Sequence, residues 1–144
     1  MFDSKDLIEQ LLAPARAAAN NAYAPYSGLH FGAAALTRDG SIITGCNVEN
    51  ASYSITQCAE RNALGAAITQ GVQRGDVVAM LIYTPGDITH SPCGACRQAI
   101  KELLSADGMV VATSGGGDPL SWKVTEILPD AFELSAKDLA AERG

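Results

Sequence analysis

Apolar positions near the start of the chain recur at helical spacing, so one face of this segment is expected to pack on a sheet. Asp3 or Ser4 can cap the first turn, and the pattern continues to about Asn20. Pro14 lies inside the pattern and is expected to kink or divide the helix, because proline removes a backbone hydrogen bond. The apolar face consists of Leu7, Ile8, Leu11 and Leu12.

Five later segments are rich in apolar and β-branched residues and predict strands. The third contains the nearly continuous run Val77–Ile82, which is typical of a central strand covered on both faces. Arg38–Gly40 supplies a turn between the first two strands, so these two are expected to form a hairpin. The predicted strands are residues 29–37, 41–48, 76–84, 109–114 and 120–124.

Two further helices are predicted between these strands. The first covers about residues 57–70, with Thr56 as its N-cap. The second runs to about residue 106, with Ser91 as its N-cap and Pro92 at its first position. Both cysteine-bearing stretches of the chain therefore fall at helix beginnings.

The order of these elements predicts an α/β fold of three layers, α/β/α, in which a mixed five-stranded sheet lies between helices. Residues 127–134 predict short helical turns, and a polar tail is expected to be helical from Ser135. The chain has 144 residues, 47% of them hydrophobic and 18% charged, which suits a single domain, residues 1–144, with its own core.

The net charge of -6 disfavours nucleic acid as a partner, because non-specific affinity for phosphate backbones comes from Lys and Arg. A free small molecule is the expected substrate. The first residues lack the basic and apolar regions of a signal peptide, and polar residues interrupt the uncharged stretch Ala17–Thr37. We therefore expect no membrane association and a cytoplasmic location.

Three cysteines form a pattern typical of a metal site. Cys58 lies two residues before Glu60, and Cys93 and Cys96 form a C-x-x-C motif whose side chains face the same way on a helix. Helix N-termini favour thiolates, which are the form that binds zinc. Our hypothesis is that the three thiolates bind one zinc ion and leave a fourth position for water.

Two charged residues beside Cys58 complete this hypothesis. Glu60 can point beside the metal without binding it, which suits a group that moves protons during catalysis. Three thiolates on a divalent ion leave excess negative charge, and Arg61 is the nearest cation that could hydrogen-bond to the sulfurs. A solvated helix carboxylate is the alternative interpretation of Glu60.

Alternatives stay open for each motif. A lone C-x-x-C also occurs in redox dithiols and in structural zinc sites, although a structural site normally has four protein ligands. We interpret Cys46 as a buried apolar residue, and His30 and His90 as ordinary histidines rather than ligands. Three polar residues after the second strand could bind sugar hydroxyls or simply cap a loop: Asn47, Glu49 and Asn50.

Cys58–Glu60 followed by Pro92–Cys96 resembles the signature of the zinc nucleoside and nucleobase deaminases. Four further stretches are similar, in the same order, to the small homotetrameric cytidine deaminases, and the resemblance covers most of the chain. These stretches are residues 22–27, 32–34, 45–53 and 128–132.

The resemblance implies a role for each matching residue. Cys58, Cys93 and Cys96 would bind Zn²⁺. Glu60 would be the proton shuttle, and Arg61 would lie against the sulfurs. For the substrate, it implies that Asn47 and Glu49 hold the ribose and that backbone groups near Ala59 and Ser91 read the base. It also implies a homotetramer with shared active sites. Phe132 would stack on the base from a neighbouring subunit, and Ala51 and Tyr53 would lie at the shared interface.

One position departs from the family pattern. The family usually has phenylalanine where this chain has Leu29, close to the nucleoside. Leu29 keeps an apolar wall without an aromatic edge, which bears on affinity and on tolerance of modified bases. Phe31 falls on the same face of the predicted strand and is placed to substitute in part.

The implied reaction is hydrolytic deamination of free cytidine or 2'-deoxycytidine, as in pyrimidine salvage. Glu60 would protonate ring nitrogen 3, water activated by zinc would add to carbon 4, and Glu60 would then pass a proton to the departing ammonia. Three alternatives are a deaminase of modified or larger nucleosides, a deaminase of single-stranded nucleic acid, and a zinc-binding or redox protein that releases no ammonia.

Overall fold

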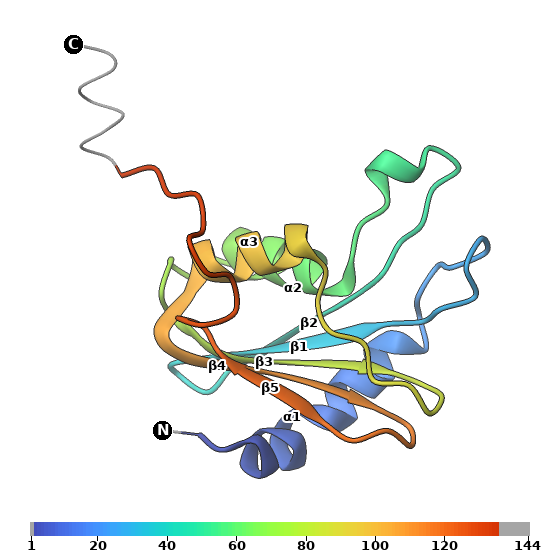
Figure 1. Cartoon of the computed structure of the whole chain (residues 1–144), viewed down its shortest axis with the longest axis horizontal. Helices are drawn as coiled ribbons and strands as arrows, with labels where there is room; N and C mark the ends of the chain where they lie inside the picture. The colour runs from blue at the N-terminus through green and yellow to red at the C-terminus, as the bar shows by residue number, and fades with distance from the viewer. Residues whose placement is uncertain (1, 136–144) are drawn as a thin grey trace.

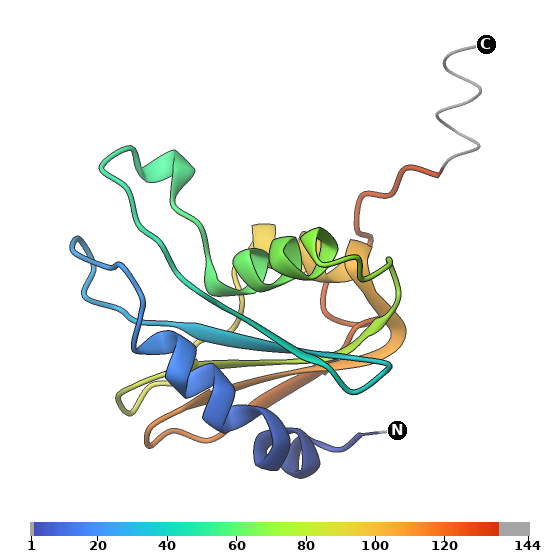
Figure 2. The ribbon, with the colours of Figure 1, turned by 180° about the vertical axis from the view of Figure 1, so that it is seen from behind.

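The computed structural model describes residues 2–135 and has three layers (Figure 1). Helix α1 (Ser4–Ala19) covers one face of the sheet, and α2 (Ala59–Thr69) and α3 (Gly94–Leu103) cover the other (Figures 1 and 2). The predicted α/β/α fold is confirmed. The remaining elements are β1 (Gly32–Thr37), β2 (Ile42–Cys46), the short 3-10 helix η1 (Tyr53–Ile55), β3 (Val77–Thr84), β4 (Leu104–Ser114) and β5 (Leu120–Lys123).

The sheet is mixed, with the strand order β2-β1-β3-β4-β5. β1 and β2 form the predicted antiparallel hairpin, and β1 also pairs antiparallel with β3. β3 and β4 are parallel, and α3 is the crossover between them. β3 is therefore the central strand, as its continuous apolar run predicted.

Alternate residues of the strands face opposite helical layers, because side chains of a strand point alternately to its two faces. Ala34 and Leu81 pack with the apolar stripe of α1, while Ala33 and Ile82 pack with α2 and α3. Leu7 and Leu11 of the α1 stripe are fully buried. The helical periodicity in the sequence therefore identified the buried face of α1 correctly.

Both cysteine-bearing helices begin later than predicted. Gln57 forms an isolated antiparallel bridge with Val48, so it is extended and Cys58, rather than Thr56, is the N-cap of α2. Cys93, rather than Ser91, is the N-cap of α3. At α2, the pairing of Gln57 with the distant Val48 keeps the residue before Cys58 out of the helix.

Other boundaries also differ from the prediction. Pro14 lies inside α1, which continues through it to Ala19 without dividing. α3 ends at Leu103 because Leu104 already pairs with Val77 in the sheet. Residues 127–134 contain turns but no helix, and the tail predicted to be helical from Ser135 falls on residues 136–144, outside the described part.

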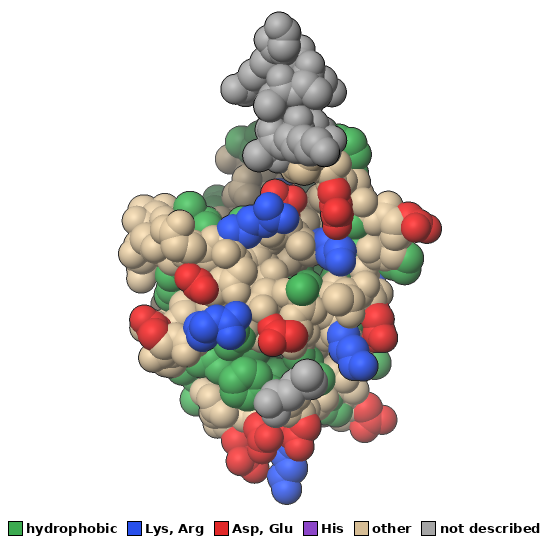
Figure 3. All heavy atoms as spheres, turned by 90° about the vertical axis from the view of Figure 1, so that its left-hand side faces the viewer, with side chains coloured by type: hydrophobic (Ala, Val, Ile, Leu, Met, Phe, Trp, Pro, Cys, Tyr) green, Lys and Arg blue, Asp and Glu red, His purple; other side chains and the backbone are tan. Residues whose placement is uncertain are grey.

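On the face shown in Figure 3, Lys and Arg side chains are interspersed with Asp and Glu and form no continuous basic patch. Within residues 2–135, no helix is long and apolar enough to cross a bilayer.

Gly45 allows α2 to lie directly on β2. A Cβ atom at this position would lie 2.4 Å from the Ala63 nitrogen and 2.6 Å from the Ala59 carbonyl oxygen. These distances are too short for any side chain, so the first turns of α2 approach the strand backbone only because residue 45 is glycine. This contact fixes the position of Cys58 and Glu60, which lie at the start of the same helix.

We predict that Gly45→Ala destabilises the protein by about 1–3 kcal/mol, because overpacking moves α2 away from β2. Gly65→Ala is the matched control: Gly65 is in the same helix, with open space where a Cβ would lie. It is expected to stabilise the helix by about 0.5–1 kcal/mol. Urea denaturation measures both values, and equal effects of the two substitutions would contradict the packing argument.

Candidate metal centre and substrate cavity

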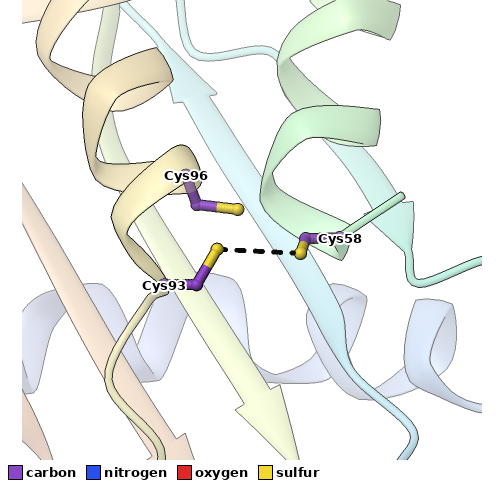
Figure 4. Close-up of side chains that lie close together, drawn as sticks. All are labelled: Cys58, Cys93 and Cys96. Carbon is purple, nitrogen blue, oxygen red and sulfur yellow. Dashed lines mark hydrogen bonds between the residues drawn. The ribbon is translucent and has the colours of Figure 1, made fainter. Parts of the chain in front are cut away.

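Three thiols meet where α2 and α3 begin. Cys58 and Cys93 are the N-caps of the two helices, and Cys96 lies in the first turn of α3. Their sulfur atoms all lie within 4.8 Å of one another, and those of Cys58 and Cys93 are 3.9 Å apart (Figure 4). Sulfurs at ~2.3 Å from a tetrahedral zinc ion are about 3.8 Å apart, so the three donors fit zinc.

The electrostatics of the cluster favour a thiolate at Cys58. A hydrogen bond with the Cys96 thiol, together with one from Arg61, lowers the pKa of Cys58 to about 5. The pKa of Cys96 is raised, because its thiol is the partner that keeps its proton. Unpaired backbone N–H groups at the two helix N-termini also favour the negatively charged thiolate form. The thiolate form is the one that binds a metal cation.

Arg61 lies on α2 with its guanidinium directed at the cluster. Its Nη2 donates to the Cys58 sulfur at 3.5 Å and to the Thr56 carbonyl at 3.4 Å. The hydrogen bond with Cys58 raises the pKa of the guanidinium, which stays charged. Its Nε is buried and has no hydrogen-bond partner among the described residues. The placement is the one expected for a cation that offsets thiolate charge.

Glu60 is a buried carboxyl group beside the thiols, with 5% of its surface exposed. Burial raises its pKa, and the nearby Cys58 thiolate adds to this effect. It lies in the first turn of α2, on the wall of a cavity that also includes Cys58 and Cys93. A carboxyl group that is hard to ionise and close to a metal site can both accept and return a proton.

The cavity beside the thiols has a volume of about 350 Å³, within the usual range for small-molecule sites. It contains most of the residues that the sequence assigned to substrate binding. Those on its wall are Leu29, Asn47, Glu49, Cys58, Ala59, Glu60, Ser91 and Cys93, together with Phe31.

The Asn47 side chain is buried and mimics a strand peptide group. Its Oδ1 accepts from the Phe31 N–H at 2.8 Å, and its Nδ2 donates to the Leu29 carbonyl at 2.8 Å. These bonds extend the β1–β2 pairing to the residues before β1, which begins at Gly32. Residues 29–31 were predicted as strand but are not part of it. Oδ1 and Nδ2 each retain one further hydrogen-bonding position, which is available to a ligand.

Glu49 organises the loop that precedes β1. Its Oε1 accepts from the backbone N–H groups of Tyr26 and Ser27, and its Oε2 accepts from the Ser27 hydroxyl at 2.5 Å. The hydroxyl bond contributes most to lowering the pKa of Glu49. The carboxylate is therefore ionised at neutral pH and holds the loop at the edge of the cavity.

Three predicted substrate-binding residues do not line this cavity. Ala51, Tyr53 and Phe132 are exposed, Tyr53 with 74% and Phe132 with 69% of its surface accessible. Tyr53 contacts the Tyr26 ring edge-on at 5.8 Å, and the Phe132 backbone carbonyl accepts from Gln98 at 2.8 Å. Aromatic side chains are enriched at protein–protein interfaces relative to the rest of the surface.

Sequence reasoning missed part of the cavity wall. His90 was taken as an ordinary histidine, yet it lines the cavity and packs edge-on against the Phe31 ring at 5.7 Å. Its place three residues before Cys93 was the one available signal. The other missed residues are Ser27, Thr56, Gln57, Ile82 and Pro92. Ser27 and Pro92 lie in stretches that carry the family resemblance, which was the available signal for these two.

Cys46 is half-buried rather than buried, because β2 is an edge strand with one open side. It is not part of the metal cluster. In the described part of the chain, Cys58, Cys93 and Cys96 are the one group of His, Cys, Asp or Glu side chains arranged to hold an ion.

The chain belongs to the family described as the cytidine and deoxycytidylate deaminase zinc-binding region, whose model matches residues 5–113. This membership and the three thiols confirm the predicted zinc cofactor.

Individual relatives agree over nearly the whole chain. A cytidine deaminase from Sporosarcina psychrophila is 42% identical over 94% of this chain and 98% of its own length. One from Halalkalibacterium halodurans is 45% identical over 91% and 96%. The crystal structure of cytidine deaminase from Burkholderia pseudomallei matches with a TM-score of 0.80 and 43% identity, over 91% of this chain and 100% of that chain.

We predict that Cys46→Ala retains one zinc ion per chain, whereas Cys96→Ala loses most of its zinc because a buried donor is removed. Both variants replace a cysteine with alanine, so Cys46→Ala is the control for the effect of removing any thiol from the chain. Elemental analysis after dialysis against a weak chelator measures the metal. Zinc lost from Cys46→Ala, or kept by Cys96→Ala, would show the ligand set to be wrong.

Proposed function

We propose that this protein catalyses the zinc-dependent hydrolytic deamination of cytidine and 2'-deoxycytidine to uridine and 2'-deoxyuridine, with release of ammonia. The observation that carries the proposal is the buried Glu60 carboxyl on the same cavity wall as the thiols of Cys58 and Cys93. Family membership supports it independently. The reaction fits pyrimidine salvage, and reduced thiols at the site suit the cytoplasm.

Glu60 performs the proton transfers in this mechanism. Zinc, when bound, supplies the Lewis acidity that makes water nucleophilic at neutral pH. Glu60 takes a proton from that water and delivers it to ring nitrogen 3, so that carbon 4 becomes electrophilic and the remaining hydroxide adds to it. Glu60 then takes the proton of the hydroxyl group on carbon 4 and delivers it to the amine nitrogen. The carbon–nitrogen bond breaks, and ammonia and the carbonyl of uridine are formed. Burial of Glu60 suits these steps, because a raised pKa makes its carboxylate a stronger base toward the water.

The rest of the cavity orients the nucleoside. Asn47 and Glu49 bind ribose hydroxyls through the hydrogen-bonding positions that their loop contacts leave open. Backbone groups near Ala59 and Ser91 read the base edge, and Leu29 forms an apolar wall. Leu29 is 45% exposed, so this wall is also open to substituted bases.

A free nucleoside is the substrate that the surface favours. The net charge of -6 and the mixed charges on the face in Figure 3 give no support to nucleic-acid binding. The chain would act as one domain.

We also propose that the chain forms a homotetramer with shared active sites. Phe132 of one subunit would stack on the base in another, and Ala51 and Tyr53 would lie at the interface. The exposure of the Tyr53 and Phe132 rings in a single chain supports this arrangement, because aromatic residues are enriched at interfaces between chains.

We predict that Glu60→Gln retains the fold and zinc but loses nearly all turnover of cytidine, because an amide cannot shuttle protons. A positioned acid–base group contributes about 10²–10⁴-fold, so a loss of at least that size is expected. The decrease in ultraviolet absorbance of cytidine measures the rate. Glu102→Gln, an exposed carboxylate at the end of α3, is the control and should keep full activity. Near-normal turnover by Glu60→Gln would remove the shuttle from the mechanism.

Shared sites predict complementation between an inactive variant and one with impaired substrate binding. Glu60→Gln lacks the proton shuttle, and Phe132→Ala is expected to have a raised KM because it lacks the stacking ring. Mixed oligomers combine Glu60 from one subunit with Phe132 from another, so some sites should regain normal KM. Steady-state kinetics after joint refolding, with light scattering for the oligomeric state, measures this. A mixture no better than the average of its components would contradict shared sites.

A further inference from the structure

Arg97 reaches back from α3 to the chain that enters the metal cluster. It directly follows Cys96, and its backbone N–H donates to the Cys93 carbonyl at 2.9 Å. Helical side chains lean toward the N-terminus of their helix, and Arg97 Nε donates to the Pro92 carbonyl at 2.8 Å. Its backbone and side chain thus bind the two consecutive carbonyl groups on either side of the Cys93 nitrogen.

The other edge of the same guanidinium is attached to the C-terminal part of the fold. Nη1 donates to the Ile127 carbonyl at 3.0 Å, and the guanidinium carbon lies 5.3 Å from the centre of the Trp122 ring in β5. Ile127 is fully buried in the core beneath α2 and α3. In Figure 1 the segment after β5 turns back toward α3. Arg97 therefore joins the cysteine loop to the core.

These contacts fix positions rather than neutralise charge. Both side-chain acceptors are neutral backbone carbonyls, and no carboxylate within residues 2–135 forms an ion pair with Arg97. A guanidinium offers its N–H donors in a rigid planar fork, so two carbonyls bound at once hold a fixed relative position. Cys93 needs such support, because it is an exposed N-cap at the end of a loop.

We propose that Arg97 is a positioning residue for the metal centre: it holds the backbone at Cys93 against the core and so sets where that sulfur lies relative to Cys58 and Cys96. The inference rests on the zinc site of the proposed function but not on the substrate. Loss of a group that orients a metal ligand typically costs about 10–100-fold in metal affinity.

The test is the rate at which the loaded protein releases zinc to a chromogenic chelator. Arg97→Met keeps an unbranched side chain but removes the donors, and we expect release to be faster by about 10-fold or more. Arg97→Lys keeps a positive charge but cannot bridge both carbonyls, so it should also release zinc fast. Wild-type release from both variants would overturn the proposal, and so would full rescue by lysine, because charge alone would then suffice.

Two control variants separate this role from general stability. Arg74→Met removes another Nε bond to a backbone carbonyl, that of Glu102 at the far end of α3. Gln98→Ala removes the bond that holds the Phe132 carbonyl, loosening the same C-terminal segment without touching Pro92. Both should release zinc at the wild-type rate. Equal acceleration by either control would show that loosening of the fold, not of Cys93, is responsible.

Two spectroscopic readouts need no substrate. Trp122 is the one tryptophan of the chain and contacts Arg97, so its fluorescence should change when zinc is removed from the wild type and not from Arg97→Met. Cobalt(II) in place of zinc should show altered ligand-field absorption in Arg97→Met and Arg97→Lys and not in the two control variants. Unaltered cobalt spectra would overturn the proposal. If these metal readouts follow expectation while cytidine is not deaminated, the proposed function fails and the role of Arg97 stands.

Discussion

The site depends on two helix N-termini being held side by side on one face of the sheet. Each terminus contributes an N-cap sulfur, and the two sulfurs lie 3.9 Å apart. One terminus is placed by close packing, because Gly45 lets α2 touch β2. The other is placed by hydrogen bonds from Arg97 to Pro92 and to the core. Metal binding thus relies on tertiary contacts rather than on the motif alone.

The sequence predicted the metal donors and the layers well because both follow from short-range patterns. Cys93 and Cys96 face the same way because of their helical spacing. Apolar periodicity predicts the strands and the helices. The start of α2 was predicted too early because its determinant is distant in the sequence. Gln57 is extended because it pairs with Val48, a contact that no local pattern encodes.

The polar residues of the cavity show why the sequence left their roles open. Asn47 bonds to residues 16 and 18 positions away, and Glu49 to residues 22 and 23 positions away. Binding sugar and capping a loop were weighed as alternatives, yet the side chains have capacity for both. The loop contacts fix the orientation of the amide and the carboxylate, and a fixed polar group binds a ligand at lower entropic cost.

Charge and geometry at the metal centre are supplied by different arginines. Arg61 donates to the Cys58 sulfur, so its cation acts directly on thiolate charge. Arg97 donates to carbonyl oxygens and lies over an aromatic ring, so its positive charge does not act directly on a thiolate. This division has a physical reason. A guanidinium bonded to sulfur follows the sulfur if the loop moves, whereas one anchored to Ile127 in the core opposes that movement. Electrostatic stabilisation and rigidity therefore require separate groups with separate attachments.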